Sequence, residues 1–493
     1  MLILGFILAA FGSYWLIRRI LGRWPAMLGA TVYTYFFYHS VNVYVRGAFA
    51  EFFAMTVLPF VFLFLHRLYE KNSLANSVFF GISLALLVLA HPLIAFPAVI
   101  FIGFIFLFYL LAAKDKINFA KAAVIGGMIG LGLSAFFWLP SLAEKQYTLT
   151  DKILTTELAA YQEHFVCPYQ FWYSPWGYGG SGDNCQSGLT FQLGKIPIAL
   201  TGLSLAGFVV YIFKKKKLSL TTGYYLLSVF LLLFSLFMAT GYSAFIWKAV
   251  SPLAYLQWPW RFLTFTALFI SIICAYGVYF FKKLLLRDTS TLLRMTINIT
   301  VLIIVIVTVI KYSPYFRPQR LISTTDAART SFEEIAWRVS GTSYEFVPKG
   351  VATKKTSLGT TTLAINENDL PRQPYQIVSG QGRVTTGKNN FSEKIFTVTA
   401  ASPLVFRLNT YYFPGWIAKV DGQKTAINDN NPLKLITVNV PAGRHQLAFR
   451  FTDTPVRILS DWLSIISVIL VLAVSGWEVK NTLASHHNSG KQA

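Results

Sequence analysis

The residues best suited to chemistry are ionisable side chains that stand at the edges of long apolar stretches. His39, Arg46 and Glu51 flank one short loop, and Arg46 and Glu51 are spaced closely enough to pair across the start of an apolar helix. Ionisable groups at membrane depth are costly to keep, so each is a functional candidate. Two interpretations stay open: a salt bridge that fixes this turn, or a site where Arg46 binds a phosphate and Glu51 orients it or a substrate hydroxyl.

Three further ionisable residues lie at the ends of apolar stretches. His91 precedes Pro92 and could be a helix cap, a packing residue or a catalyst. Glu144 opens a polar loop and is either a solvated charge or a catalytic carboxylate. Arg261, beside Trp258, could snorkel to lipid headgroups or bind the phosphate of a lipid-linked donor.

The composition indicates that these ionisable residues lie among long apolar helices. Of 493 residues, 54% are hydrophobic and only 13% are charged, against about 25% charged in soluble domains. The net charge of +22 could suggest nucleic acid, but the basic residues punctuate loops between apolar runs, so we expect no nucleic-acid partner. Three cysteines and seven scattered histidines offer no metal-ligand spacing. We therefore predict no metal site and no cofactor, with a divalent cation left open.

The apolar runs predict a polytopic α-helical membrane protein with about eleven spans. Basic loops alternate with loops poor in Lys and Arg, which places the basic loops in the cytoplasm. The sequence thus predicts a multi-pass domain over 1–312 with an outer loop at 141–195, an extracytoplasmic β-rich domain over 313–457, a last helix over 458–476 and a cytoplasmic tail over 477–493. The expected spans are Leu2 to Ile17, Pro25 to Tyr38, Phe49 to Leu65, Asn76 to Ala90, Leu93 to Leu111, Ala122 to Leu139, Ile196 to Phe213, Leu218 to Thr240, Phe262 to Phe281, Ile297 to Ile310 and Ile458 to Val474.

The two outer segments differ in character. In 313–457, period-2 apolar alternation predicts a small antiparallel β-sandwich, with Asp421-Gly422 as a two-residue hairpin turn and a surface helix from Thr325 to Val339. The 141–195 loop is rich in aromatic residues, among them Trp172 and Trp176, which could anchor at the bilayer interface or form a platform for sugar rings. Cys167 and Cys185 lie in the same loop and are candidates for a disulfide that would contribute about 3 kcal/mol.

Several stretches together resemble a bacterial and archaeal membrane protein family that is labelled 6-pyruvoyl-tetrahydropterin synthase-related. One of these stretches is also shared with YfhO-type membrane proteins. The soluble pterin synthase is a zinc enzyme with clustered histidines, and this chain has no such cluster, so the label does not describe an activity. The matching motifs are Val43 to Glu51 followed by Leu58-Pro59, Leu89 to Pro92, Leu256 to Phe262, Tyr411 to Trp416 with Val420 to Gly422 (the YfhO-like stretch), and Pro441 to His445 running to Thr454-Pro455.

In architecture that family resembles the GT-C glycosyltransferases, which transfer sugars from polyprenyl-phosphate carriers on the extracytoplasmic side. The resemblance implies an outward cavity, a lipid-phosphate donor and a β-domain that holds the acceptor glycan. The leading hypothesis is therefore transfer of a sugar to an envelope glycan or lipid at the cell membrane, with the donor phosphate held by Arg46 or Arg261 and with Glu51 and Glu144 as candidate catalytic carboxylates. GT-C enzymes carry their catalytic acidic residue in the loop after the first helix. The first helix here matches the span that follows that loop, and an odd number of spans would place Met1 outside, so we expect an additional upstream helix and loop. The alternative function is a non-catalytic transporter or scaffold of envelope polymer assembly.

Overall fold

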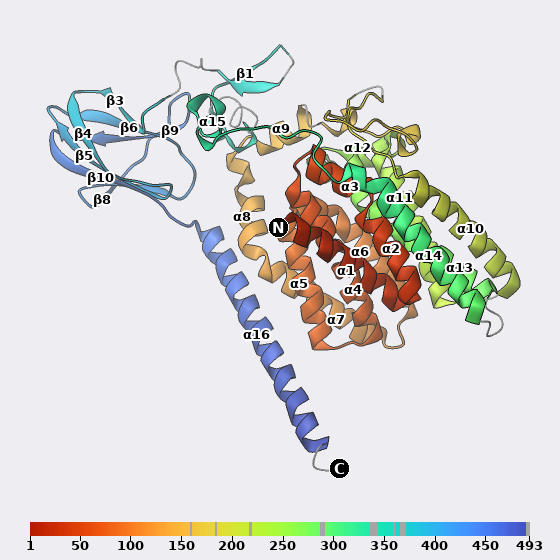
Figure 1. The fold of residues 1–493 in the computed structure, drawn as a ribbon. Helices are drawn as coiled ribbons and strands as arrows, with labels where there is room; N and C mark the ends of the chain where they lie inside the picture. The colour runs from red at the N-terminus through yellow and green to blue at the C-terminus, as the bar shows by residue number, and fades with distance from the viewer. Residues whose placement is uncertain are drawn as a thin grey trace. The chain divides into compact units, whose positions relative to one another are not determined.

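The computed structural model describes residues 1–157, 160–182, 185–215, 219–285, 291–335, 344–357, 360–364 and 371–489. The chain divides into two compact units (Figure 1), which are described separately. The helical unit comprises residues 1–138, 160–322 and 463–493, and the β unit comprises residues 139–159 and 323–462.

The described residues contain nine helices that are long and apolar enough to cross a membrane. Polar side chains mark several helix starts: Ser73, Asp115 and Ser219 each accept a hydrogen bond from a backbone N–H three residues onward, which satisfies one of the free donors of the first turn. The nine helices are α1 (Leu2–Leu21), α4 (Phe49–Glu70), α6 (Pro92–Ala112), α7 (Lys116–Leu133), α10 (Lys195–Lys215), α11 (Leu220–Ala239), α13 (Leu263–Leu285), α14 (Thr291–Tyr312) and α16 (Pro455–Ser489).

Two of the expected spans are shorter helices, α2 (Arg23–Thr34) and α5 (Leu74–Ala90). A helix of 12 residues is about 18 Å long, too short to cross the hydrocarbon core alone. The multi-pass architecture is therefore clear, while the number of spans stays a prediction. The remaining short helices are α3 (Phe37–Ser40), α8 (Ala135–Glu144), α9 (Thr150–Thr156), α12 (Ala244–Ala249) and α15 (Asp326–Arg329).

Helix α13 forms the centre of the helical unit and is buried along nearly its whole length. It packs against α2, α10 and α11, whereas α1 packs against α2 and α4. Helices α1 and α4 run in the same direction, because Gly5 lies against Phe52 near one end and Arg19 pairs with Glu70 at the other. The start of α4 therefore lies at the bundle end opposite to the basic residues that close α1.

The β unit contains two antiparallel sheets and a separate two-stranded pair (Figure 1). The five-stranded sheet has the order β4-β5-β10-β7-β8 and the three-stranded sheet the order β3-β6-β9. Phe396, Phe406 and Phe449, from both sheets, share one buried core, which gives the sandwich-like packing that the alternation predicted. The strands are β1 (Thr353–Lys355), β2 (Thr361–Leu363), β3 (Tyr375–Ser379), β4 (Gly382–Asn389), β5 (Glu393–Ala400), β6 (Leu404–Tyr411), β7 (Trp416–Val420), β8 (Gln423–Thr425), β9 (Leu435–Val440) and β10 (Gly443–Phe451).

Two local predictions for the β unit have different outcomes. The hairpin at Asp421-Gly422 is confirmed: both residues have positive φ, and Val420 pairs with Gln423. The predicted surface helix is confirmed in part: α15 ends at Arg329, residues 332–335 are helical again, and residues 336–339 lie outside the described part. Thr330 and Ser331 interrupt it, consistent with the tendency of such side chains to bond to nearby backbone groups.

Candidate functional site

The segment from Tyr38 to Glu51 leaves regular α-helical geometry before α4 begins. A π-helix, η1 (Val41–Val45), follows α3, and the N–H of Arg46 donates to the carbonyl of Val41 at 2.9 Å. Gly47 then adopts φ +64° and turns the chain into α4, a conformation that favours glycine. π-Helical turns are rare and are often found at functional sites; this one places Arg46 beside the first turn of α4.

Glu51 is fully buried and its carboxylate is engaged from three directions. Arg46 Nη1 donates at 2.9 Å, Arg261 Nε donates at 3.4 Å, and the Tyr38 hydroxyl donates as well. Asn42 accepts a further bond from Arg46. Arg46 and Arg261 thus meet at one carboxylate although they are far apart in sequence; we call these three residues the Arg46–Glu51–Arg261 cluster.

Arg261 is held by a strained turn just before its own short helix, η7 (Pro259–Phe262). Gln257 has φ +62° and ψ −53°, and the N–H of Trp258 donates back to the carbonyl of Leu256 at 2.6 Å, the geometry of a γ-turn that is rare for a non-glycine residue. Arg261 Nη1 donates to the same Leu256 carbonyl at 2.7 Å and to Gln257 Oε1 at 3.3 Å. Backbone strain of this kind concentrates at functional sites, and here it fixes the guanidinium.

Two tryptophans cover the guanidinium groups. The Arg261 guanidinium carbon lies 4.4 Å from the Trp258 ring centroid, and that of Arg46 lies 4.3 Å from the Trp260 centroid. The two indole rings stack with centroids 5.3 Å apart. Cations over indole faces are stabilised by the ring quadrupole, so both guanidiniums keep their charge while largely removed from water.

The cluster carries one excess positive charge, because two guanidiniums share one carboxylate. Its guanidinium side chains are 13% and 5% exposed, so the excess charge is only partly screened. Where planar, bidentate contacts to phosphate are needed, arginine is used in preference to other cationic side chains. The arrangement is therefore suited to an anion, with Glu51 as the counter-ion that orients both arginines.

The two histidines near this segment, unlike the residues of the cluster, have buried ring nitrogens without hydrogen-bond partners among the described residues. His39 is fully buried among rings, with Tyr33 perpendicular at 4.8 Å and Phe52 at 5.9 Å. Neither of its ring nitrogens is hydrogen-bonded to a described residue. His91 joins α5 to α6, and its buried Nδ1 also has no hydrogen-bond partner among the described residues. His91 is therefore not a side-chain cap of α6.

Glu144 belongs to the β unit and is not a solvated loop charge. Its carboxylate accepts bonds from Arg457 Nη2 at 2.7 Å, Arg457 Nε at 3.1 Å and the Thr454 hydroxyl at 2.6 Å. Phe451 and Phe413 flank the Arg457 guanidinium. Both Arg457 donors reach the same oxygen, Oε2, while Thr454 donates to Oε1, so this contact ties α8 to the start of α16. The catalytic assignment of Glu144 stays a prediction.

The loop after residue 160 reaches the tryptophans of the cluster. Trp260 Nε1 donates to Ser181 Oγ at 2.9 Å, and His164 Nδ1 lies 2.8 Å from the same oxygen. The structure joins Cys167 to Cys185 in a disulfide on either side of Ser181. The loop is thus cross-linked close to the point where it contacts the site.

The two loop tryptophans lie in different surroundings. Trp176 packs edge-on against Tyr315, with centroids 5.0 Å apart. Trp172 is 54% exposed, with Lys195 Nζ 5.7 Å from its ring. Both the interface-anchor and the sugar-platform interpretations of Trp172 remain predictions.

A family described as "6-pyruvoyl-tetrahydropterin synthase related domain; membrane protein" matches residues 1–318. The chain belongs to this family. All members of the Arg46–Glu51–Arg261 cluster fall within the matched region. No curated protein and no solved structure matches the chain. Among the described residues, no group of three or more His, Cys, Asp or Glu side chains is placed to hold a metal ion.

Sequence reasoning missed part of this family member's site. Tyr38 and Asn42 precede Arg46 at intervals of one helical turn, a spacing that could have grouped all three on one face. Trp260 was visible beside Arg261, but nothing in the sequence indicated that its ring would cover Arg46 instead. The contact of Ser181 could not be predicted from the sequence, because serine is common in loops and its partner, Trp260, lies far away in the chain.

Proposed function

We propose that this membrane protein is glycosyltransferase-like: it binds a polyprenyl-phosphate-linked sugar and transfers the sugar to an envelope glycan or lipid on the outer face of the cell membrane. The observation that supports this is the excess positive charge of the Arg46–Glu51–Arg261 cluster, walled by Trp258 and Trp260. A phosphate monoester or diester would neutralise that charge, and the apolar helices around it suit a lipid-borne ligand.

The end of the bundle that holds the cluster supports an outward orientation. The cluster lies where α4 begins, whereas Arg19 and Glu70 pair at the opposite end of α1 and α4. Basic loops face the cytoplasm in most membrane proteins, so the cluster and the 141–195 loop would face outward, together with the β-rich segment. In the proposal, this side also supplies the acceptor glycan.

In the proposed reaction, the acceptor hydroxyl oxygen forms a bond to the anomeric carbon, and the bond from that carbon to the phosphate oxygen breaks. The polyprenyl phosphate leaves with the bonding electron pair, and Arg46 and Arg261 stabilise the negative charge that develops on it. The hydroxyl proton passes to a carboxylate acting as general base. Glu51 and Glu144 are the candidates, and no cofactor is invoked.

One observation favours a non-catalytic alternative. The Glu51 carboxylate already accepts bonds from two arginines and a tyrosine, and taking up a proton would leave two buried guanidiniums without a counter-ion, which is costly. A carboxylate so engaged orients a binding site better than it accepts protons. The same cluster would then bind the lipid phosphate in a transporter or scaffold of envelope polymer assembly.

The test measures binding and transfer separately on the full chain. Purified protein is assayed for retention of polyprenyl phosphate, and membranes are assayed for transfer of radiolabelled sugar from polyprenyl-phosphate donors. We expect Arg46→Gln and Arg261→Gln each to lower retention at least tenfold. This factor corresponds to the binding free energy of roughly one charge-assisted hydrogen bond. Arg19→Gln, at the opposite end of the bundle, is the control and should retain lipid normally.

The outcomes separate the two functions. Retention together with transfer, both lost in Arg261→Gln, supports the enzyme, and Glu51→Gln then tests whether that carboxylate is the base. Retention without transfer from any donor supports the binding protein. Equal retention by the wild type and both arginine variants would refute a phosphate site at the cluster.

A further inference from the structure

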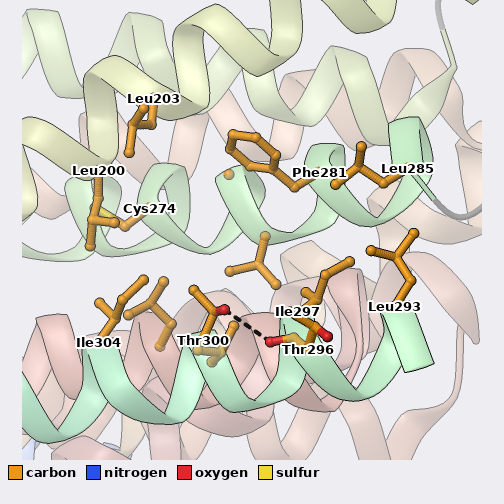
Figure 2. A pocket seen from close by; sticks show the side chains of 14 residues that line it. Leu200, Leu203, Cys274, Phe281, Leu285, Leu293, Thr296, Ile297, Thr300 and Ile304 are labelled. Atoms are coloured by element: carbon orange, nitrogen blue, oxygen red, sulfur yellow. Dashed lines mark hydrogen bonds between the residues drawn. The ribbon is translucent and has the colours of Figure 1, made fainter. Parts of the chain in front are cut away.

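A second feature lies at the basic end of the helical unit, away from the cluster. It is an elongated cavity of about 360 Å³. Figure 2 shows side chains of α10, α13 and α14 that point into this space, including Leu200, Phe281 and Ile304. We call it the α13 groove. Its described lining is apolar apart from hydroxyl and thiol groups, which suits a hydrocarbon chain.

The polar groups of the lining are already satisfied by nearby backbone. Thr300 Oγ1 donates to the carbonyl of Thr296 at 2.9 Å, as the dashed line in Figure 2 marks, and Thr296 Oγ1 donates to Leu292. Cys274 Sγ lies 3.5 Å from the Pro197 carbonyl. The groove therefore offers no free donor or acceptor among these side chains, and a polar headgroup would have to remain outside it.

One end of the groove lies toward a contact between α10 and α14 near residue 312. At the end nearer residue 312, α10 and α14 are joined: the N–H of Ile196 donates to the Tyr312 hydroxyl at 3.1 Å, and Gly194 lies against the same ring. Leu203 of α10 and Leu293 of α14 both line the cavity. A chain that fills the groove would therefore enter from the basic end.

Positive charge gathers at that end. Lys282 lies near the end of α13, and Arg294 lies near the start of α14, one helical turn before Asn298. Lys282 Nζ donates to Asn298 Oδ1 at 2.9 Å, and no described carboxylate pairs with either cation. Two like charges with no counter-ion among the described residues, beside an apolar groove, are complementary to an anionic headgroup on a hydrocarbon chain. Basic pockets between membrane helices bind anionic lipids on these grounds.

We propose that the α13 groove binds one acyl chain of an anionic glycerophospholipid, whose phosphate lies between Lys282 and Arg294. This site is independent of the Arg46–Glu51–Arg261 cluster, since it uses other residues at the opposite end of the bundle. The bound lipid would fill the space between α13 and α14 and relieve the repulsion between the two cations.

The test uses two photoactivatable lipids, phosphatidylglycerol and phosphatidylcholine, with the same diazirine-bearing acyl chain. The full chain is reconstituted with each lipid, irradiated and digested, and labelled peptides are counted by mass spectrometry. We expect phosphatidylglycerol to label α13 and α14 within residues 274–304 several-fold more than phosphatidylcholine. Lys282→Gln and Arg294→Gln should each lower this labelling roughly fivefold, whereas Lys71→Gln, an exposed cation elsewhere, should not.

A second pair of variants tests the groove itself. Thr300→Phe places a ring in the cavity and should abolish labelling of α13, while Ile303→Phe, at an exposed position of α14 outside the lining, should leave it unchanged. Monodisperse elution of each variant shows that it is folded. Equal labelling by the two lipids, or labelling unaffected by Thr300→Phe, would overturn the proposal and indicate ordinary annular lipid.

Discussion

Arg46 Nη1 and Glu51 Oε2 lie 2.9 Å apart across the turn at Gly47, with the carboxylate fully buried. The sequence spacing allowed this pair, but the same carboxylate also accepts a hydrogen bond from Arg261, 210 residues away in the chain. Arg46 and Glu51 are therefore part of a three-residue site, and the pair does more than fix the start of α4.

Replacing the shared carboxylate should destabilise the helical unit. In Glu51→Gln, two largely buried guanidiniums lose their counter-ion, and we expect a loss of about 3–5 kcal/mol in the free energy of unfolding. Arg19→Gln breaks a partly exposed pair and should cost less than about 1 kcal/mol. Thermal unfolding in detergent measures both, and similar transition temperatures for the two variants would contradict the buried-cluster account.

The effect of replacing Gly47 on stability should come from its backbone conformation and not from steric clashes. A Cβ at this position meets nothing within 4 Å, but the φ of +64° is unfavourable for other residues, so Gly47→Ala should cost about 1–2 kcal/mol. Gly103 in α6 also has free space around a Cβ but no positive φ, and Gly103→Ala should stabilise by about 0.4–1 kcal/mol. Opposite signs of the two shifts in thermal unfolding are the expected result; a neutral Gly47→Ala would argue against the left-handed turn.

The sandwich-like core of the β unit should respond sharply to truncation. Phe406 is fully buried between the two sheets, so Phe406→Ala should cost about 3–5 kcal/mol. Phe391 is 90% exposed, and Phe391→Ala should change stability by no more than about 0.5 kcal/mol. Limited proteolysis followed by peptide mapping over 371–452 reads out this unit separately; equal protection in the two variants would contradict the shared core.

A surface pair in the β unit should show a defined pH response. His445 Nδ1 lies 2.6 Å from Asp421 Oδ2; this hydrogen bond raises the pKa of His445 and lowers the pKa of Asp421. The contribution of His445 is complete below its unfolded pKa of about 6.5 and is lost as pH rises through the raised value. That of Asp421 is present above about 3.9 and is lost as pH falls through the lowered value.

The pair therefore stabilises the folded state between these two transitions. Asp421→Asn keeps a residue that tolerates the positive φ of the turn but removes the charge, so the pKa of His445 should return toward about 6.5. NMR titration of ¹³C-labelled histidine, with the signal assigned by His445→Gln, measures this change. An unaltered His445 titration in the Asp421→Asn variant would show that the carboxylate is not its partner.

Features that depend on local pattern could be read from the sequence. Apolar runs determine which segments become long helices, because burying backbone polar groups in an apolar medium requires internal hydrogen bonds. Alternation determines which segments become strands, and Asp421-Gly422 determines a hairpin because few other dipeptides accept two positive φ values. Likewise, Arg46 and Glu51 were identified as a pair because they are close in the chain.

Features that depend on distant segments were decided only by the tertiary structure. Arg261 meets Glu51 because α13 packs in the centre of the unit, and Glu144 meets Arg457 because α8 and the start of α16 both belong to the β unit. Charge alone cannot choose among 43 basic and 21 acidic residues. The choice comes from packing, which buries a few of these charges and leaves each with only the partners that surround it.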